Sequence, residues 1–412
     1  MRAMAVVVPI FAAAFSACTS ATPVSQQPET SPTEAVPPAD TAAPSNEALD
    51  PLIELGELSL TWDVQEVGEG IKPALSVDDE GIAHVAFLTE ADHGRLFYAN
   101  NRDGEFDVET VAEGYFYGPV DIALGPEGDP FIAYHDHQGL QVDPALGDAV
   151  VAHLGEGGWE LTPVTDDGHD GWDNSIAVDN AGNWHAAGVD PSQFGGDDGV
   201  EYATISDEVI TVSAVGSGPI KYEFGTSVQI DSSGSPAVAY YNDRDQQLEV
   251  SFFNEGNWSV EVVDNEGDAG RFASLVFGPD GMPHVAYYVS ESSESGTVRH
   301  AWKDASGWQI ENVGILQNLR MGHVGARKIT SLAFDPVGNL HLAYTDRDQL
   351  IYAQKTEDGW VGQDVIEPES RILGQLVELA IDADGNPHLT WFEAVQVSPS
   401  LEGIVRYAAG GQ

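Results

Sequence analysis

Apolar and polar positions alternate along most of the chain in a unit that is clearest from Thr330 to Tyr344, TSLAFDPVGNLHLAY. Leu332 and Phe334 alternate with small or polar residues, a short segment from Asp to Gly follows, and alternation resumes at Leu340. Side chains two positions apart share one face of a strand, and Asp and Gly at the ends of a four-residue segment favour a type I turn. The unit therefore predicts two short antiparallel strands joined by a tight turn.

The same unit recurs at intervals of roughly 50 residues. Its turn glycine stands at Gly81, Gly128, Gly182, Gly234, Gly281, Gly338 and Gly385. Two further strands follow in most copies, and the second of them usually carries an aromatic residue five positions before a valine, as at Trp308 and Val313. A repeat of this length that contains strands is typical of a β-propeller. We therefore predict an all-β fold, a seven-bladed β-propeller of four-stranded blades.

The last copy lacks its fourth strand, because the chain ends shortly after Tyr407. A matching piece lies at the other end of the repeat region, where Trp62 and Val67 have the spacing of an outer strand. Pairing the two ends would close the ring and remove an exposed sheet edge. We expect the N-terminal strand to complete the last blade, with residues 57–412 forming the propeller.

Residues 1–18 have the pattern of an export signal, with Arg2 before an apolar run that is too short to span a membrane. The ending Phe15-Ser16-Ala17-Cys18 resembles the bacterial lipobox, in which the cysteine becomes the lipid-modified first residue. The alternative is an ordinary signal peptide cut nearby, with Cys18 incidental. The resemblance implies an exported lipoprotein of the outer membrane or cell surface that meets the membrane only through its lipid.

Residues 19–56 are rich in Pro, Thr, Ser and Ala and contain few large apolar side chains. Such a segment cannot bury enough surface to fold. We interpret it as a disordered tether.

The chain contains 16 Lys and Arg against 67 Asp and Glu, a formal charge of -51. This excess repels polyanions, so we expect no nucleic-acid partner. It is compatible with solubility, adaptation to high salt or the collection of divalent cations. Cys18 is the single cysteine, which rules out an intrachain disulfide and a cysteine-based metal site. We expect a monomer.

The pattern S-[LIV]-A-x-D-x-x-G-x-P-H-[LV]-A-Y, read at 330–344 and 377–391, resembles the sialidase-like, BNR-type propeller repeats of bacterial secreted proteins. No copy has the Ser-x-Asp-x-Gly-x-Thr-Trp spacing of the sialidase Asp-box. Propellers of this group include carbohydrate-binding modules, scaffolds and polysaccharide lyases. The resemblance therefore implies the fold and leaves the function open.

Five histidines occupy one position of the repeat, three residues after the turn glycine: His84, His185, His284, His341 and His388. A catalytic group is needed once, so a recurring histidine indicates a structural hydrogen bond at the start of a strand.

Basic residues gather in the loops that join one blade to the next, on the face that also carries the hairpins after the second strand. We call this the top face. The loop 314–330 holds Arg327, Lys328 and His323 and contains no acid, and Arg271 belongs to another joining loop. The positive electrostatic field of these residues suits a ligand that carries a carboxylate or sulfate group. The alternative is ion pairing with acids of neighbouring loops, such as Asp264, Glu266 and Asp268.

A second polar cluster combines His169, Trp172 and Asp173, where the indole could stack on a sugar. Trp172 could equally be a packing residue between blades. The Asp-x-Asp hairpins at 243–245 and 346–348 could bind Ca²⁺ through oxygen, although a solvated turn is the default. We expect no cofactor and keep Ca²⁺ as the alternative.

Three functions fit these residues. The first is a non-enzymatic, envelope-anchored propeller that binds a glycan or an envelope or extracellular protein through its top face. The second is a polysaccharide lyase or glycoside hydrolase acting on an acidic glycan. In that enzyme Arg271, Arg327 or Lys328 would neutralise a carboxylate, and His169 or His323 would transfer the proton. The third is a structural scaffold. The predicted ligand-binding residues are Trp172, Asp173, Arg271, His323, Arg327 and Lys328.

Overall fold

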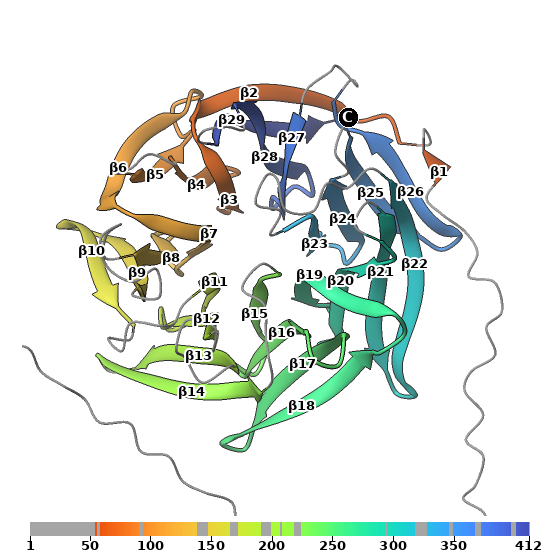
Figure 1. Ribbon diagram of the computed structural model, residues 1–412. Helices are drawn as coiled ribbons and strands as arrows, with labels where there is room; N and C mark the ends of the chain where they lie inside the picture. Colours follow the sequence, from red (N-terminus) through yellow and green to blue (C-terminus); the bar gives the residue numbers. More distant parts are fainter. Residues whose placement is uncertain are drawn as a thin grey trace, which may run out of the picture. The chain divides into compact units, whose positions relative to one another are not determined.

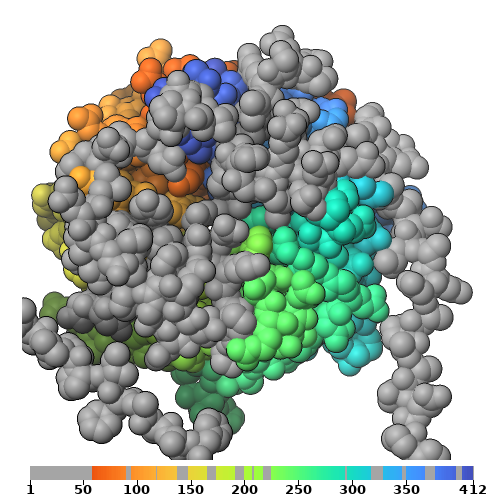
Figure 2. Space-filling view, viewed as in Figure 1, coloured from red at the N-terminus to blue at the C-terminus, as the bar shows by residue number. Residues whose placement is uncertain are grey.

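The computed structural model describes residues 54–55, 58–89, 94–137, 147–164, 172–190, 199–206, 208–217, 224–292, 295–317, 328–345, 349–366, 372–396 and 401–411. These residues form seven antiparallel sheets arranged as blades around one axis (Figure 1). In a space-filling view along the same direction, the described atoms of the green blades form a contiguous surface (Figure 2). The seven-bladed β-propeller predicted from the repeat is confirmed.

Each blade runs from an inner strand at the axis to an outer strand. Blade 1 contains β3 (Ile71–Val77), β4 (Ala83–Leu88), β5 (Gly94–Asn100) and β6 (Asp107–Gly114). Blade 2 contains β7 (Phe116–Leu124), β8 (Pro130–His137), β9 (Gly147–Gly155) and β10 (Gly158–Pro163). Blade 3 contains β11 (Trp172–Val178), β12 (Trp184–Asp190), β13 (Gly199–Ser206) and β14 (Val209–Ser217). Blade 4 contains β15 (Thr226–Ile230), β16 (Pro236–Asn242), β17 (Gln247–Asn254) and β18 (Asn257–Asp264).

The remaining blades follow the same plan. Blade 5 contains β19 (Asp268–Phe277), β20 (Pro283–Ser290), β21 (Ser295–Asp304) and β22 (Gly307–Gln317). Blade 6 contains β23 (Thr330–Phe334), β24 (Leu340–Thr345), β25 (Leu350–Thr356) and β26 (Gly359–Asp364). Blade 7 contains β27 (Ile372–Ile381), β28 (Pro387–Gln396), β29 (Glu402–Gly411) and, from the other end of the chain, β2 (Thr61–Glu69).

The ring closes through β2, which pairs antiparallel with β29 and places Gln65 opposite Tyr407. The predicted closure by the N-terminal strand is therefore confirmed. The structure adds one strand that the repeat did not indicate, because β1 (Glu54–Leu55) pairs in parallel with the outer strand of blade 6. Two residues are too short to show an alternating pattern, and an outer strand offers free backbone groups for such pairing.

The predicted turn geometry is present. In blade 1 the carboxylate of Asp78 accepts the backbone N–H groups of Glu80 and Ile82 at 2.9 and 2.8 Å. Gly81 follows with φ of 79°, in the left-handed region that glycine adopts without strain. Equivalent bonds hold the turns that begin at Asp179, Asp231, Asp335 and Asp382.

A ladder of serines links the inner strands of successive blades. The hydroxyl of Ser175 in blade 3 accepts the N–H of Val228 in blade 4 at 3.0 Å. The same bond, also at 3.0 Å, joins the next three pairs of blades: Ser227 with Leu275, Ser274 with Leu332, and Ser331 with Leu379. Each serine accepts a backbone N–H of the next blade that has no partner within that blade's own sheet. The ladder therefore ties neighbouring blades together near the axis.

Aromatic rings fill the spaces between blades farther from the axis. Tyr98 of blade 1 packs edge-on against Trp159 of blade 2, and Tyr202 of blade 3 against Trp258 of blade 4. Trp62 of β2 packs in the same way against Tyr352 of blade 6. Edge-to-face aromatic pairs contribute beyond their buried area. In these three fourth strands the aromatic position is thus a packing position.

Candidate functional site

The serine ladder is interrupted in three blades that are neighbours around the ring. Its position holds Glu378 in blade 7, Ala74 in blade 1 and Asp121 in blade 2. Asp121 keeps the inter-blade bond, because one carboxylate oxygen accepts the N–H of Ile176 at 2.9 Å. Its other oxygen accepts the N–H of Ile122 at 3.0 Å, a donor that Ala74 cannot satisfy. Two of the three blades therefore carry a carboxylate where four others carry a hydroxyl.

Lys328 brings a positive charge to the same place. Its Nζ lies 2.6 Å from Oε1 of Glu378, and the two side chains are 24% and 8% exposed. The backbone holds the lysine in position, because its carbonyl accepts the N–H of Val377 at 2.9 Å. The hydroxyl of Ser331 donates to the other oxygen of Glu378 at 3.3 Å. We call Asp121, Lys328 and Glu378 the axial trio.

The charges of the axial trio interact. Burial raises the pKa of Glu378 to about 7, and the charge of Asp121 acts in the same direction while the ammonium of Lys328 opposes it. Burial tends to lower the pKa of Lys328, but the charges of Glu378 and Asp121 outweigh it and raise that pKa. Burial and the charge of Asp121 therefore make Glu378 easier to protonate than an exposed glutamate, and Lys328 stays charged.

Arg271, a predicted ligand-binding residue, lies in an ion pair. Its Nε is 3.1 Å from the carboxylate of Asp268, which Nη2 also contacts, and the hydroxyl of Tyr241 donates to the same carboxylate at 2.6 Å. The guanidinium lies 4.5 Å from the centre of the Phe224 ring. Both described members of the predicted basic set, Arg271 and Lys328, are thus paired with carboxylates. Asp268 is one of the acids that the ion-pairing alternative named, whereas Glu378 is not.

Trp172 and Asp173 begin the inner strand of blade 3. Trp172 stands opposite Val189 in the sheet. Asp173 is buried, with φ of 53°, and its carbonyl accepts the hydroxyl of Thr226 at 3.2 Å. Four predicted site residues lie outside the described residues, namely Cys18, His169, His323 and Arg327. The convergence of His169, His323 and Arg327 with Arg271, which an enzyme would require, stays a prediction.

The repeated histidines make the structural bonds that their register indicates. In four blades Nδ1 contacts the hydroxyl of a tyrosine on the third strand at 2.5 to 2.7 Å: His84 with Tyr98, His185 with Tyr202, His341 with Tyr352, and His388 with Tyr407. Burial lowers the pKa of all four imidazoles, although the turn aspartates oppose the shift. In blade 5 His284 instead contacts His300 at 3.0 Å.

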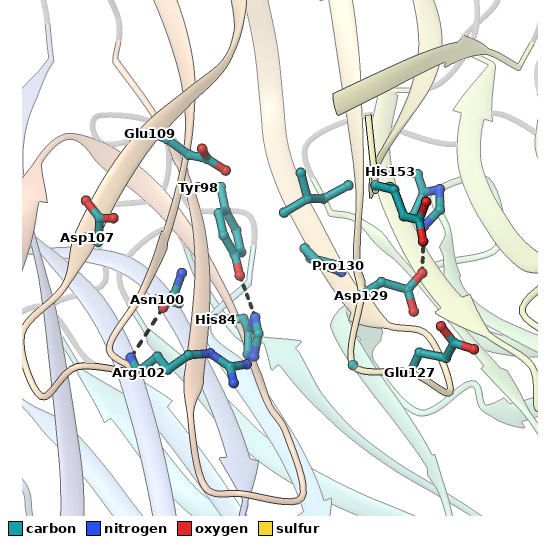
Figure 3. A pocket seen from close by; sticks show the side chains of 14 residues that line it. His84, Tyr98, Asn100, Arg102, Asp107, Glu109, Glu127, Asp129, Pro130 and His153 are labelled. Atoms are coloured by element: carbon teal, nitrogen blue, oxygen red, sulfur yellow. Dashed lines mark hydrogen bonds and ion pairs between the residues drawn. The ribbon is translucent and has the colours of Figure 1, made fainter. Parts of the chain in front are cut away.

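A groove of about 620 Å³ lies between blades 1 and 2, on the face opposite the top face (Figure 3). Blade 2 departs from the repeat here, because Phe131 takes the histidine position. His153, from the neighbouring strand, stacks on Phe131 with ring centres 4.1 Å apart and contacts Asp129 at 2.6 Å. The substitution of Phe131 for histidine is visible in the sequence. The repeat pattern alone does not indicate a groove at this place.

In the described part of the chain, no group of three or more His, Cys, Asp or Glu residues is arranged to hold a metal ion. The hairpin at 243–245 belongs to that part, whereas 346–348 lies outside it. The described residues also contain no helix that is long and apolar enough to cross a membrane.

No protein-family model matches the chain, and no curated protein matches it. Among solved structures, the β-propeller domain of Cps50 (Swd1) from Myceliophteria thermophila is 9% identical with a TM-score of 0.51, over 86% of this chain and 100% of that one. A protein of unknown function from Dyadobacter fermentans is 11% identical with a TM-score of 0.49, over 85% and 99%.

The GH93 α-L-arabinofuranosidase of Fusarium graminearum, in complex with arabinobiose, is 11% identical with a TM-score of 0.46, over 82% and 93%. At these identities the likeness shows the fold alone. The chain is a seven-bladed β-propeller whose structural neighbours include glycoside hydrolases.

Proposed function

We propose that this protein is an envelope-anchored propeller that binds a glycan at the axial trio, on the side where the joining loops of the top face enter the inner strands. The observation that supports the proposal is the replacement of the ladder serine by Asp121 and Glu378, with Lys328 beside them. Serine meets the structural need at this position in four blades. The charged groups are therefore an addition that the fold does not require.

Charged groups near the axis are costly to place. Removing a carboxylate or an ammonium from water costs several kcal/mol unless partners compensate, and a buried ion pair is seldom a net gain in stability. Their presence together near the axis is better explained by a ligand. Sugar hydroxyls both donate and accept hydrogen bonds, so they can bind an ammonium and a carboxylate at once.

The charge balance of the trio bears on which glycan would bind. Lys328 is already paired with Glu378, and Arg271 with Asp268. A uronate or sulfate would have to displace a carboxylate of the protein to reach either cation. We therefore propose a glycan recognised through its hydroxyl groups, and not the acidic glycan of the enzyme hypothesis.

A glycan-array screen of the full chain tests this function. We expect Glu378→Gln and Lys328→Gln each to reduce binding to the best glycan by at least tenfold, because each removes a charge-assisted hydrogen bond. The matched control is Arg95→Gln, which removes a charge from an exposed ion pair with Glu113. Binding that is equal in all three variants and the parent would refute a site at the trio. Binding to a protein ligand alone would refute the glycan.

A second candidate function is glycan cleavage, and it is favoured by one observation. A carboxyl group with a pKa near 7, as burial gives Glu378, can serve as a general acid or base at neutral pH. Reducing ends or unsaturated uronates released from a bound glycan would report hydrolysis or elimination. Loss of that release in Glu378→Gln, measured at a glycan concentration that saturates the variant, would establish an enzyme. Binding without any release would exclude it.

Envelope anchoring is the remaining part of the proposal, and it is supported by the lipobox-like ending at Cys18. Radiolabelled palmitate should be incorporated into the parent and not into Cys18→Ser, and the variant should move from the membrane to the soluble fraction. Equal labelling of both proteins would remove Cys18 as the lipidation site.

A further inference from the structure

Three outer strands carry a glutamate at the same repeat position, and each glutamate is bonded to a tryptophan of the next blade. The indole Nε1 donates to the carboxylate in all three cases: Trp159 to Glu109 at 2.9 Å, Trp308 to Glu261 at 3.0 Å, and Trp360 to Glu311 at 2.9 Å. The three junctions therefore begin from the same arrangement of one acid and one indole.

At two of these junctions a lysine completes the arrangement. Nζ of Lys303 lies 2.7 Å from both oxygens of Glu261. Nζ of Lys355 lies 2.8 and 2.5 Å from the oxygens of Glu311. The two ammonium groups also lie 6.0 and 5.5 Å from the centres of the indole rings, within the range of cation–π attraction. The propeller thus uses this position twice to bind an ammonium group of its own.

The junction between blades 1 and 2 lacks that lysine. Leu154 stands opposite Trp159 in the strand register, as Lys303 stands opposite Trp308. Leu154 and Glu109 both line the groove of about 620 Å³ described above. Figure 3 shows Glu109 at one end of this groove, beside Tyr98. The place that lysine fills at the other junctions is open to a ligand here.

The charge of the groove suits a cation. Its lining carries five carboxylates, Asp107, Glu109, Glu127, Asp129 and Glu156, against one guanidinium. That guanidinium belongs to Arg102, which is turned toward acids outside the lining, 3.5 Å from Glu80 and 3.8 Å from Asp78. A field of this sign attracts amines and repels anions.

We propose that the groove between blades 1 and 2 binds the primary ammonium group of a small amine, held by Glu109 and the indole of Trp159 where the other junctions use lysine. The amine could be carried by an aliphatic diamine or by an amino sugar, which present the same group. This site lies on the face opposite the proposed glycan site and does not depend on it.

The full chain labelled with ¹⁵N-tryptophan provides the test, because the indole N–H of Trp159 reports directly on Glu109. The probes are n-butylamine, 1,4-diaminobutane and glucosamine, with n-butanol as a neutral control of similar shape. We expect each amine, and not n-butanol, to shift the Trp159 signal, which Trp159→Phe identifies. Tighter binding of 1,4-diaminobutane or of glucosamine would assign the natural source. Equal shifts with n-butylamine and n-butanol would overturn the proposal.

Three variants sharpen the test. Glu109→Gln keeps the acceptor for the indole and removes the charge, so it should weaken amine binding by about fivefold. Leu154→Lys should fill the groove with the chain's own ammonium and abolish binding. Lys303→Leu should create a second amine site, reported by the indole of Trp308, because Glu261 would lose its lysine. Unchanged binding in Leu154→Lys together with no new site in Lys303→Leu would refute the proposal, even if one variant folds poorly.

Discussion

Replacing a serine of the inner-strand ladder by alanine tests how the blades are held together. In Ser227→Ala the N–H of Leu275 loses its acceptor, which lies at 3.0 Å, and both residues are buried. An unsatisfied buried N–H costs about 1–3 kcal/mol. We therefore expect the free energy of unfolding to fall by about 2 kcal/mol. Urea unfolding of the full chain would show this as a lower midpoint with an unchanged slope.

The chain itself indicates how the loss can be reversed. In blade 1 the ladder position is Ala74, and the N–H of Ile122 is satisfied by Asp121 of its own strand. The double variant Ser227→Ala, Ser274→Asp should therefore recover part of the stability that Ser227→Ala loses. Ser259→Ala, at an exposed position of β18, is the control and should change little. Full stability in Ser227→Ala, or no recovery in the double variant, would refute the role of the ladder.

Other expectations follow from burial, ion pairing and ring closure. Burial, aided by the charge of His300, lowers the pKa of His284 from 6.5 to about 4. Between about pH 6.5 and pH 4 this histidine is protonated in the unfolded chain and neutral in the folded protein. Lowering the pH through that range should therefore lower the urea midpoint, and it should lower the midpoint of His284→Gln less steeply. A parallel fall in both proteins would contradict this. Arg271→Ala should lower the melting temperature, because it leaves the carboxylate of Asp268 without its cation; an unchanged value would mean that the pair is unimportant. Deleting residues 57–67 should remove most of β2 and lower stability sharply, and a deletion variant as stable as the parent would contradict closure through β2.

The fold could be predicted from the sequence because each blade repeats the same local pattern. Alternation, the Asp-to-Gly turn and the aromatic position of the fourth strand are all local signals. Closure through Trp62 was predictable for the same reason, because a strand was missing at one end and present at the other. The strand β1 was not, since two residues carry no period and depend on an outer edge supplied by blade 6.

The candidate sites were harder to predict because they depend on contacts between blades. Lys328 was selected for its charge, but its partner Glu378 lies about 50 residues away, on the inner strand of the next blade. Departures from the repeat mark both candidate sites more clearly than charge does. Asp121 and Glu378 at a serine position and Leu154 at a lysine position are visible once the copies are aligned. Their meaning required knowing that the serine bridges blades and that the lysine binds a glutamate.

Closure through β2 also has a consequence for biosynthesis. Thr61 and Gly411 are hydrogen-bonded although they are 350 positions apart, so blade 7 cannot form until β29 has been made. Contacts between such distant residues form slowly. A product that stops before β29 would leave β2 without its partner strand. Ring closure should therefore wait until β29 has been translated, and products that stop before it should be preferred substrates for quality-control proteases.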